Sequence, residues 1–273
     1  MKLLITLYTF SLGCLLTAIN ACTKNKVYTE ESQGTNFNLL LKTVMKLSNF
    51  NTDEITNFRY NSSGGLIEIT TSSFDQSTGK PYKTIETFFR NATGRIDSIN
   101  YKIESEGQII INNNTIFHYN TSNDLSPVYT KNGGDSSSYT FSGGQLVKRK
   151  NYTNCCGSGL SLLSTFNYSY DNARNLIQFV SSYTTHPVSD TVLYTFDLKI
   201  FPIPALRGIN WVFFWAPAFF DDYTFKNNPL SKRQTNSDNF DYEYQYTPND
   251  KPLYQKIKDA SGPLYAEVYY YYD

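Results

Sequence analysis

Short stretches of alternating apolar and polar residues recur along most of the chain, and each ends in a polar turn. Residues 55–60 and 166–170 are two such stretches. A period of two predicts a β-strand with one buried face. The turns that follow are rich in Asn, Asp and Gly, which adopt the conformations that tight turns need. Because a second alternating stretch then begins, as at residues 66–70, each unit predicts a β-hairpin.

The unit of an aromatic residue, a polar turn and an aliphatic residue occurs seven times. The turns span residues 60–66, 89–96, 119–125, 141–146, 170–176, 225–230 and 246–253. The aliphatic residues that close them are 30, 29, 21, 30, 54 and 23 residues apart, so one hairpin-sized unit recurs with a single insertion. We therefore expect an all-β fold. Its form is an antiparallel meander of tandem β-hairpins that curls into a sheet, a roll or a partly open barrel.

One segment fits two kinds of secondary structure. Between residues 34 and 49, apolar side chains lie at helical spacing, which by itself predicts an amphipathic helix. Residues 41–48 nevertheless resemble the second strands of the hairpins. Leu41 also precedes Leu66 by 25 residues, in phase with the units that follow. We therefore predict that this segment is the first strand of the sheet.

The long gap in the repeat contains an insertion, residues 201–220, that is rich in proline and aromatic residues. Its aromatic members include Trp211, Trp215, Phe219 and Phe220. The favoured interpretation is a plug that lies on the sheet or caps one end of it. As a candidate ligand platform, the same side chains would stack on a sugar or an apolar molecule. As a third alternative, the loop would dip into a membrane, since it is too short and too broken by proline to span one.

The N-terminus has the features of a bacterial lipoprotein signal. Lys2 supplies the positive charge, residues 3–18 form the apolar stretch, and Ala21 is the small residue that precedes the cleavage site. Cys22 would then carry the lipid, whose acyl chains give stable membrane binding. Cys14 is a rival acceptor, but it would leave a very short apolar stretch. A retained signal anchor is the other alternative, although the stretch is shorter than a spanning helix.

Composition agrees with an exported β protein. Aromatic residues make up 16% of the 273 residues and charged residues only 18%. Lys and Arg number 24, as do Asp and Glu, so no excess of positive charge points to nucleic acid. We expect no nucleic-acid partner.

The cysteine and histidine residues give weak signals. Cys155 and Cys156 are neighbours in a predicted turn and are a candidate disulfide in an oxidising compartment, although two loop thiols without a function are the favoured interpretation. His118 and His186 are the only histidines, and neither has a ligand at zinc-site spacing. We expect no metal and no cofactor.

Acidic residues offer a third weak signal. Asp221 and Asp222 follow the insertion, and Asp238, Asp241 and Glu243 add charge nearby. They would suit calcium or paired acids, but a solvated loop is favoured because adjacent residues of a strand point to opposite faces. The chain contains no nucleophile elbow, phosphate loop or dinucleotide fingerprint. No catalytic residues are predicted, and we expect the protein not to be an enzyme.

Residues 168–176, Tyr-Ser-Tyr-Asp-Asn-Ala-Arg-Asn-Leu, resemble the YD repeat of bacterial envelope and toxin-shell proteins. Asn175 stands at or beside the place where that repeat has glycine, and only this unit keeps the Tyr-Asp pair. The mature chain is similar to uncharacterised lipoproteins of Bacteroidetes-type bacteria that are built from YD-repeat-like tandem hairpins. Their proline- and aromatic-rich insertion precedes an Asn-Asn-Pro turn, as residues 201–230 do here. The resemblance implies a meandering sheet and no established activity.

These observations predict a domain organisation and a class of function. Residues 1–21 form the signal peptide, residues 22–37 a tether and residues 38–273 the hairpin domain, with the insertion at 201–220. We expect a lipoprotein held in the membrane through Cys22, in the outer membrane and on its periplasmic side. It would bind a glycan or an envelope protein. Alternatives are a structural or adhesin-like surface spacer and an enzyme that acts on glycans.

Overall fold

The computed structural model describes the hairpin region of the chain. The described residues are 39–48, 53–62, 64–75, 78–92, 96–119, 127–132, 134–143, 145–154, 159–200, 227–235 and 238–273. In these ranges no helix is long and apolar enough to cross a membrane.

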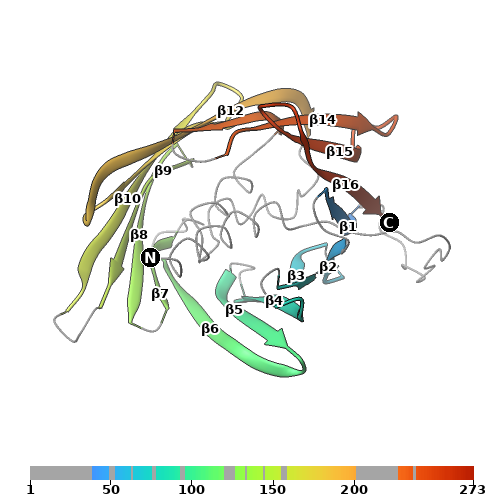
Figure 1. Cartoon of the computed structure of the whole chain (residues 1–273). Helices are drawn as coiled ribbons and strands as arrows, with labels where there is room; N and C mark the ends of the chain where they lie inside the picture. The colour runs from blue at the N-terminus through green and yellow to red at the C-terminus, as the bar shows by residue number, and fades with distance from the viewer. Residues whose placement is uncertain are drawn as a thin grey trace.

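Sixteen antiparallel strands follow one another as a meander (Figure 1). Their bounds are β1 (Leu40–Leu47), β2 (Asp53–Tyr60), β3 (Leu66–Phe74), β4 (Pro81–Arg90), β5 (Ile96–Ser105), β6 (Gln108–Tyr119), β7 (Pro127–Asn132), β8 (Asp135–Ser142), β9 (Gln145–Thr153), β10 (Ser161–Tyr170), β11 (Leu176–Tyr183), β12 (His186–Ile200), β13 (Asn227–Gln234), β14 (Phe240–Tyr246), β15 (Pro252–Asp259) and β16 (Leu264–Tyr272). The predicted meander of hairpins is confirmed, and β1 confirms the strand prediction for residues 41–48.

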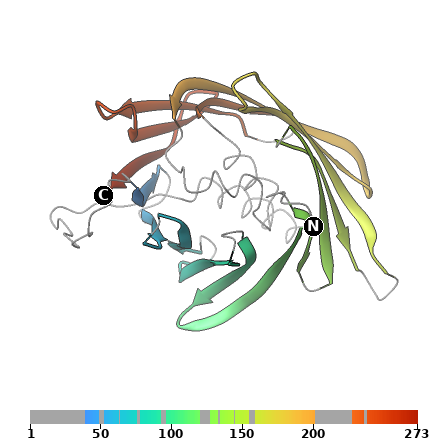
Figure 2. The same cartoon turned by 180° about the vertical axis from the view of Figure 1, so that it is seen from behind.

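The first and last strands pair with each other, so the sheet is a closed barrel. β1 pairs with β2 along one side and with β16 along the other, from Leu40 opposite Tyr272 to Leu47 opposite Ala266. Figures 1 and 2 show the strands as one curved wall in which β1 lies beside β16. Closure leaves no unpaired sheet edge.

The two ends of the barrel differ. One end, here called the tyrosine rim, holds the short turns that lead from each even-numbered strand to the next odd-numbered one, such as residues 60–66 and 170–176. The other end, here called the far rim, holds the connections from odd-numbered to even-numbered strands, such as residues 105–108. The ends of the insertion, Ile200 and Asn227, belong to the tyrosine rim.

Every odd-numbered strand has a β-bulge within its first four residues. In β3, for example, Tyr60 pairs with Leu66 and Arg59 with Glu68, so Ile67 is the extra residue. The equivalent extra residues are Leu41, Asp97, Val128, Val147, Ile177, Leu230 and Leu253. A bulge bends its strand and increases its twist. It also places inward side chains three residues apart, as at Leu66 and Ile69.

Three of the leucines that mark the sequence repeat lie at bulges. Leu41, Leu230 and Leu253 are bulge residues and are exposed, whereas Leu40, Pro229 and Pro252 take the buried positions. The prediction of an Asn-Asn-Pro turn at residues 226–230 is wrong, because the residues from Asn227 on form the start of β13. Leu125 lies outside the described residues.

Hydrogen bonds from tyrosine side chains join neighbouring turns along the tyrosine rim. Each of these tyrosines ends an even-numbered strand, and its hydroxyl donates to the carbonyl oxygen of the first buried residue of the preceding odd-numbered strand. The pairs are Tyr60 with Leu40 (2.8 Å), Tyr119 with Ile96 (2.5 Å), Tyr170 with Leu146 (2.9 Å) and Tyr272 with Pro252 (2.9 Å). The tyrosines therefore bury their rings and still satisfy their hydroxyl groups.

Three of the rim turns share one backbone geometry. Asn61, Asp171 and Thr247 each begin a turn in which the fourth residue has a positive φ. That residue is Gly64 in the first turn, but Arg174 (φ 71°) and Asp250 (φ 59°) in the others. The glycine position of the Tyr-Asp turn is therefore held by Arg174, the residue before Asn175.

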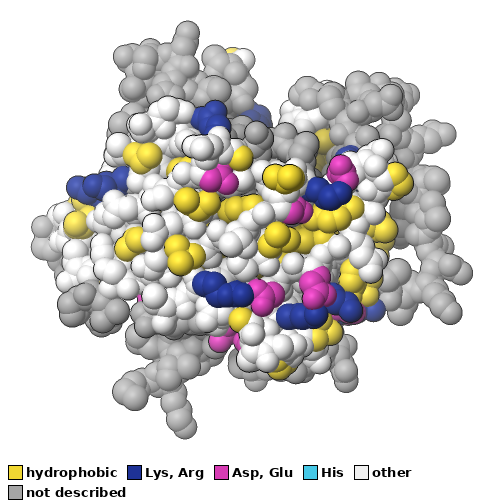
Figure 3. Space-filling view, turned by 90° about the horizontal axis from the view of Figure 1, so that it is seen from above, with side chains coloured by type: hydrophobic (Ala, Val, Ile, Leu, Met, Phe, Trp, Pro, Cys, Tyr) yellow, Lys and Arg dark blue, Asp and Glu magenta, His cyan; other side chains and the backbone are white. Residues whose placement is uncertain are grey.

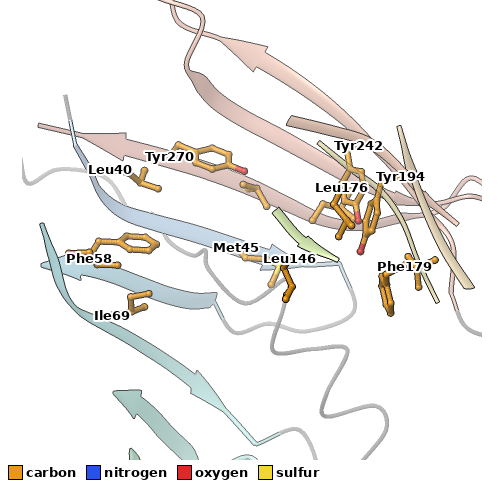
Figure 4. Close-up of a cluster of buried hydrophobic side chains, with 14 of the residues drawn as sticks. Leu40, Met45, Phe58, Ile69, Leu146, Leu176, Phe179, Tyr194, Tyr242 and Tyr270 are labelled. Atoms are coloured by element: carbon orange, nitrogen blue, oxygen red, sulfur yellow. The ribbon is translucent and has the colours of Figure 1, made fainter. Parts of the chain in front are cut away.

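The inner wall of the barrel is apolar and aromatic. Figure 4 shows some of its buried side chains, including Leu40, Phe58, Phe179 and Tyr242. These side chains are buried, and aromatic rings pack across neighbouring strands, as Tyr168 does against Phe179 with centroids 6.2 Å apart.

The outer wall carries the charged side chains. Arg59 pairs with Glu68 at 2.9 Å across β2 and β3, and Arg233 pairs with Asp241 across β13 and β14. Further charged residues on this face are Lys42, Lys46, Lys83, Lys102, Lys148, Lys150, Glu243, Lys256, Lys258 and Glu267. Figure 3 shows basic and acidic side chains beside one another, with hydrophobic ones interspersed. The inner wall is thus mainly apolar and aromatic, whereas the outer wall mixes charged side chains with exposed apolar ones such as Phe89 and Leu193.

Two carboxyl groups interrupt the apolar inner wall, as do the buried basic side chains Arg149 and Lys232. Glu54 lies opposite Met45, and Glu86 lies between Ile69 and Tyr101. One oxygen of each carboxyl is buried without a hydrogen-bond partner among the described residues. Burial raises the pKa of both groups to about 8, because a charged carboxylate is poorly solvated there.

These carboxyls predict that stability falls with rising pH. In the unfolded chain they ionise near their ordinary pKa of 4.5, whereas in the folded chain they stay protonated up to about pH 8. The folded state therefore binds more protons between these values, and the free energy of unfolding decreases as the pH rises from about 4.5 to about 8. Thermal melts across this range should show a falling melting temperature.

Glu54→Gln with Glu86→Gln should flatten this pH dependence, since an amide does not ionise. Glu243→Gln, at an exposed position on the outer wall, is the matched control and should leave the slope unchanged. A melting temperature of the unaltered protein that stays constant from pH 5 to pH 8 would contradict the assignment of neutral buried carboxyls.

Candidate functional site

A network of buried polar side chains lies on the tyrosine rim, where β12 ends and β13 begins. Its central members are Asn175, Asp197, Asn227 and Asn228. Asn175 and Asn228 are 2% and 0% exposed, which is unusual for amide side chains. Since residues 201–226 connect β12 to β13, this network, here called the rim network, holds both ends of the insertion in place.

Asn175 and Asn227 are joined by two hydrogen bonds. The Asn175 Nδ2 donates to Asn227 Oδ1 at 3.1 Å, and the backbone N–H of Asn227 donates to Asn175 Oδ1 at 2.9 Å. Asp171 fixes Asn175 by accepting from its backbone N–H at 2.8 Å and from its Nδ2 at 3.0 Å. The rim turn before β11 is thereby tied to the start of β13.

Asp197 and Asn228 form the second half of the rim network. Asp197 Oδ1 accepts from the backbone N–H groups of Lys199 at 2.8 Å and Asn228 at 3.2 Å, and the Tyr246 hydroxyl donates to Oδ2. Asn228 Nδ2 donates to the Lys199 carbonyl oxygen at 3.2 Å. Asn228 Oδ1 is a buried acceptor without a partner among the described residues.

Solvent-accessible groups border the rim network. Lys199 forms an ion pair with Asp250, and its Nζ lies 4.6 Å from the centre of the Tyr246 ring. The Lys199 and Asp250 side chains are 37% and 67% exposed. Burial, and next the hydrogen bond to Asp197, raise the pKa of Tyr246 well above its usual value, so its hydroxyl stays protonated.

This arrangement suits hydrogen bonding to a molecule with many hydroxyl groups. A carboxylate, an ammonium group and a tyrosine ring are held at fixed positions, and together they offer acceptors, donors and an aromatic face. Within the described ranges no group of three or more His, Cys, Asp or Glu side chains could hold a metal ion.

The residues singled out from the sequence lie outside the described residues. These are Cys22, Cys155, Cys156, Trp211, Trp215, Phe219, Phe220, Asp221 and Asp222. Of the other acids, Asp241 pairs with Arg233 and Glu243 with Lys258, both on the outer wall. The predicted ligand platform and the predicted disulfide therefore stay predictions.

Sequence reasoning missed the rim network. Asn227 and Asn228 were assigned to a turn, and Asp197 lies in an alternating strand that gave no sign of burial. Two consecutive asparagines at the start of a strand are an available signal, because asparagine is depleted in strands.

Comparisons with known proteins establish the fold alone. No protein-family model and no curated protein matches the chain. Its structure is similar to a porin-like protein from Bacteroides uniformis, with 12% sequence identity, a TM-score of 0.55, and coverage of 86% of this chain and 96% of that chain. A porin-like protein from Bacteroides vulgatus is 9% identical, with a TM-score of 0.42 and coverage of 86% and 99%. The Photorhabdus luminescens Tc holotoxin pore is 11% identical, with a TM-score of 0.30 and coverage of 77% and 13%.

Proposed function

We propose that this chain is a lipid-anchored protein of the bacterial cell envelope that stands in water and binds an envelope glycan at the tyrosine rim. The polarity of the two barrel walls carries the proposal. Barrels that cross a membrane alternate with apolar side chains outward and polar ones inward. Here most of the inner wall is apolar, as at Phe58 and Phe179, and most charged side chains are on the outer wall, as at Arg59 and Lys148.

The cost of placing this outer wall in lipid supports a position in water. An Arg or Lys on the lipid-facing wall costs about 2–4 kcal/mol at the middle of a bilayer. Basic residues are spread over many strands of the outer wall, among them Lys42, Lys102 and Lys256. A protein of this kind needs an anchor to stay at a membrane, and the lipoprotein signal that ends at Cys22 supplies one.

The tyrosine rim is the proposed ligand-binding end. The rim network joins the end of β12 to the start of β13, the two strands that the aromatic insertion connects. The exposed pair of Lys199 and Asp250 stands beside the Tyr246 ring at the same place. Glycans are bound through such combinations of hydroxyl-directed hydrogen bonds and aromatic faces.

If Cys22 carries the lipid anchor, replacing this one residue should abolish lipidation. Cys22→Ser should abolish incorporation of labelled palmitate and release the protein from membranes after a carbonate wash. Cys14→Ser is the matched control and should leave both unchanged. Continued membrane association of the Cys22→Ser protein would contradict the lipoprotein assignment.

Glycan binding predicts different effects for two exposed ion pairs. A glycan array with the full chain in detergent would identify a ligand. The double variant Lys199→Ala with Asp250→Ala should then weaken binding of that ligand about tenfold or more, since charged hydrogen bonds contribute about 1.5–3 kcal/mol. Lys80→Ala with Glu106→Ala removes a comparable pair on the far rim, where the side chains are 54% and 58% exposed. This control should bind normally, and equal effects of both variants would exclude the tyrosine rim.

The insertion has two alternative roles, which tryptophan truncation separates. If the insertion is a plug, Trp211→Ala or Trp215→Ala removes a buried ring and lowers the free energy of unfolding by about 3–5 kcal/mol. If it is a ligand platform, stability changes by only about 0.5 kcal/mol while glycan binding is lost. We expect the plug, with at least one tryptophan buried. Unchanged melting temperatures for both variants would contradict it.

A further inference from the structure

Two apolar arms project from the far rim. The isoleucine arm consists of Ile109, Ile110 and Ile111 at the start of β6, and the leucine arm of Leu160, Leu162 and Leu163 at the start of β10. Ile110 is 64% exposed and Leu160 58%. Every side chain from Gln108 to Asn112 is exposed, so both faces of the isoleucine arm are uncovered. Large aliphatic side chains exposed in this way mark an interaction surface.

We propose that the isoleucine arm and the leucine arm insert their side chains into the interfacial region of a lipid leaflet. The two strands that carry them have no Lys, Arg, Asp or Glu, whereas most other strands of the barrel do. The side chains of the arms can therefore enter an interface without bringing a charge of their own. The charges beside the isoleucine arm are Glu104, which pairs with Ile109, and Glu106, which forms an exposed ion pair with Lys80. Shallow insertion in the interfacial region keeps these groups in contact with water and lipid headgroups.

The spacing of the arms favours lipid over a protein partner. The β7–β8 hairpin lies between them in the barrel, so the apolar side chains form two separate points and not one continuous patch. A protein partner binds a continuous, complementary surface of about 800 Å². A fluid leaflet accepts separate protrusions, in the way it accepts other shallow interfacial anchors.

The N-terminal tether is long enough for the lipid anchor and the two arms to enter the same leaflet. This point rests on the proposed lipid at Cys22. Leu39, the first described residue, stands at the tyrosine rim, 17 residues after Cys22. A chain of 17 residues reaches at most about 55–60 Å. β6 has 12 residues and spans about 40 Å. The tether is therefore long enough to run from the tyrosine rim past the far rim, so the acyl chains at Cys22 can lie in the leaflet that the far rim touches.

Lipid-quenched tryptophan fluorescence tests the docking on the full chain. Ile110→Trp places a reporter on the isoleucine arm, and Ile116→Trp places one on the outer wall of the same strand, where Ile116 is 45% exposed. Each variant is mixed with vesicles of phosphatidylethanolamine and phosphatidylglycerol that contain brominated lipid, and the signal of the parent protein with Trp211 and Trp215 is subtracted. Quenching at position 110 with none at position 116 is the expected result. Circular dichroism checks that both variants fold.

The other outcomes are distinct. Flotation with the vesicles but no quenching at either position overturns the docking and leaves the proposed function intact. Quenching at position 116 overturns both, because it places the outer wall in lipid. Failure to float with the vesicles also overturns the docking. A dimer that dissociates when Ile109, Ile110 and Ile111 are changed to Ser, without any quenching at position 110, would assign the arm to a second copy of the chain.

Because the arms carry no charge, we expect the quenching at position 110 to persist when phosphatidylglycerol is omitted. Loss of the signal in uncharged vesicles would mean that electrostatic attraction, and not the isoleucine side chains, holds the far rim at the membrane, and would overturn the inference.

Discussion

The β-bulge near the start of every odd-numbered strand is the constraint on which the rest of the barrel depends. It bends each strand as it leaves the tyrosine rim and adds twist to the sheet, in the direction that lets β1 reach β16. It also changes which side chain faces inward at that rim. In β3, Leu66 and Ile69 both face inward although they are three residues apart, because Ile67 is the extra residue of the bulge.

Closure gives the two walls different environments. Once β1 pairs with β16, every side chain of every strand is on the inside or on the outside, and no edge strand remains. Apolar and aromatic side chains occupy the inside, where Glu54 and Glu86 become neutral, and paired charges such as Arg59 and Glu68 occupy the outside. A barrel of this polarity is compatible with water around its wall and contrasts with a barrel whose wall faces lipid.

The two rims have different chemistry because the connections at each rim differ. The tyrosine rim has short turns, hydrogen bonds from tyrosine hydroxyls to backbone carbonyls, and the rim network around Asn175 and Asn228. The far rim has the two uncharged, apolar arms. One end of the barrel thus offers fixed polar groups and the other offers exposed aliphatic side chains, which is the basis for placing a glycan at the first and a lipid leaflet at the second.

The sequence by itself determined the type and order of the elements. Alternation and turn composition are local properties, so they identified the hairpins and the first strand. The sequence did not indicate that Leu41, Leu230 and Leu253 are exposed, since a bulge shifts the facing of a side chain without a distinct composition. Residues 34–49 fitted a helix by the spacing of their apolar side chains and a strand by their place in the repeat.

Only the tertiary structure decided whether the sheet closes, which face is inside, and where the buried polar groups meet. The Asn175 and Asn227 side chains are 52 residues apart in sequence, and Asp197 and Tyr246 are 49 apart. Their contacts depend on the register of three or four strands taken together, and that register follows from the bulges and from the β1–β16 pairing. No local pattern encodes it, because the hydrogen bonds from Asn175 to Asn227 and from Tyr246 to Asp197 join residues that only the assembled sheet brings together.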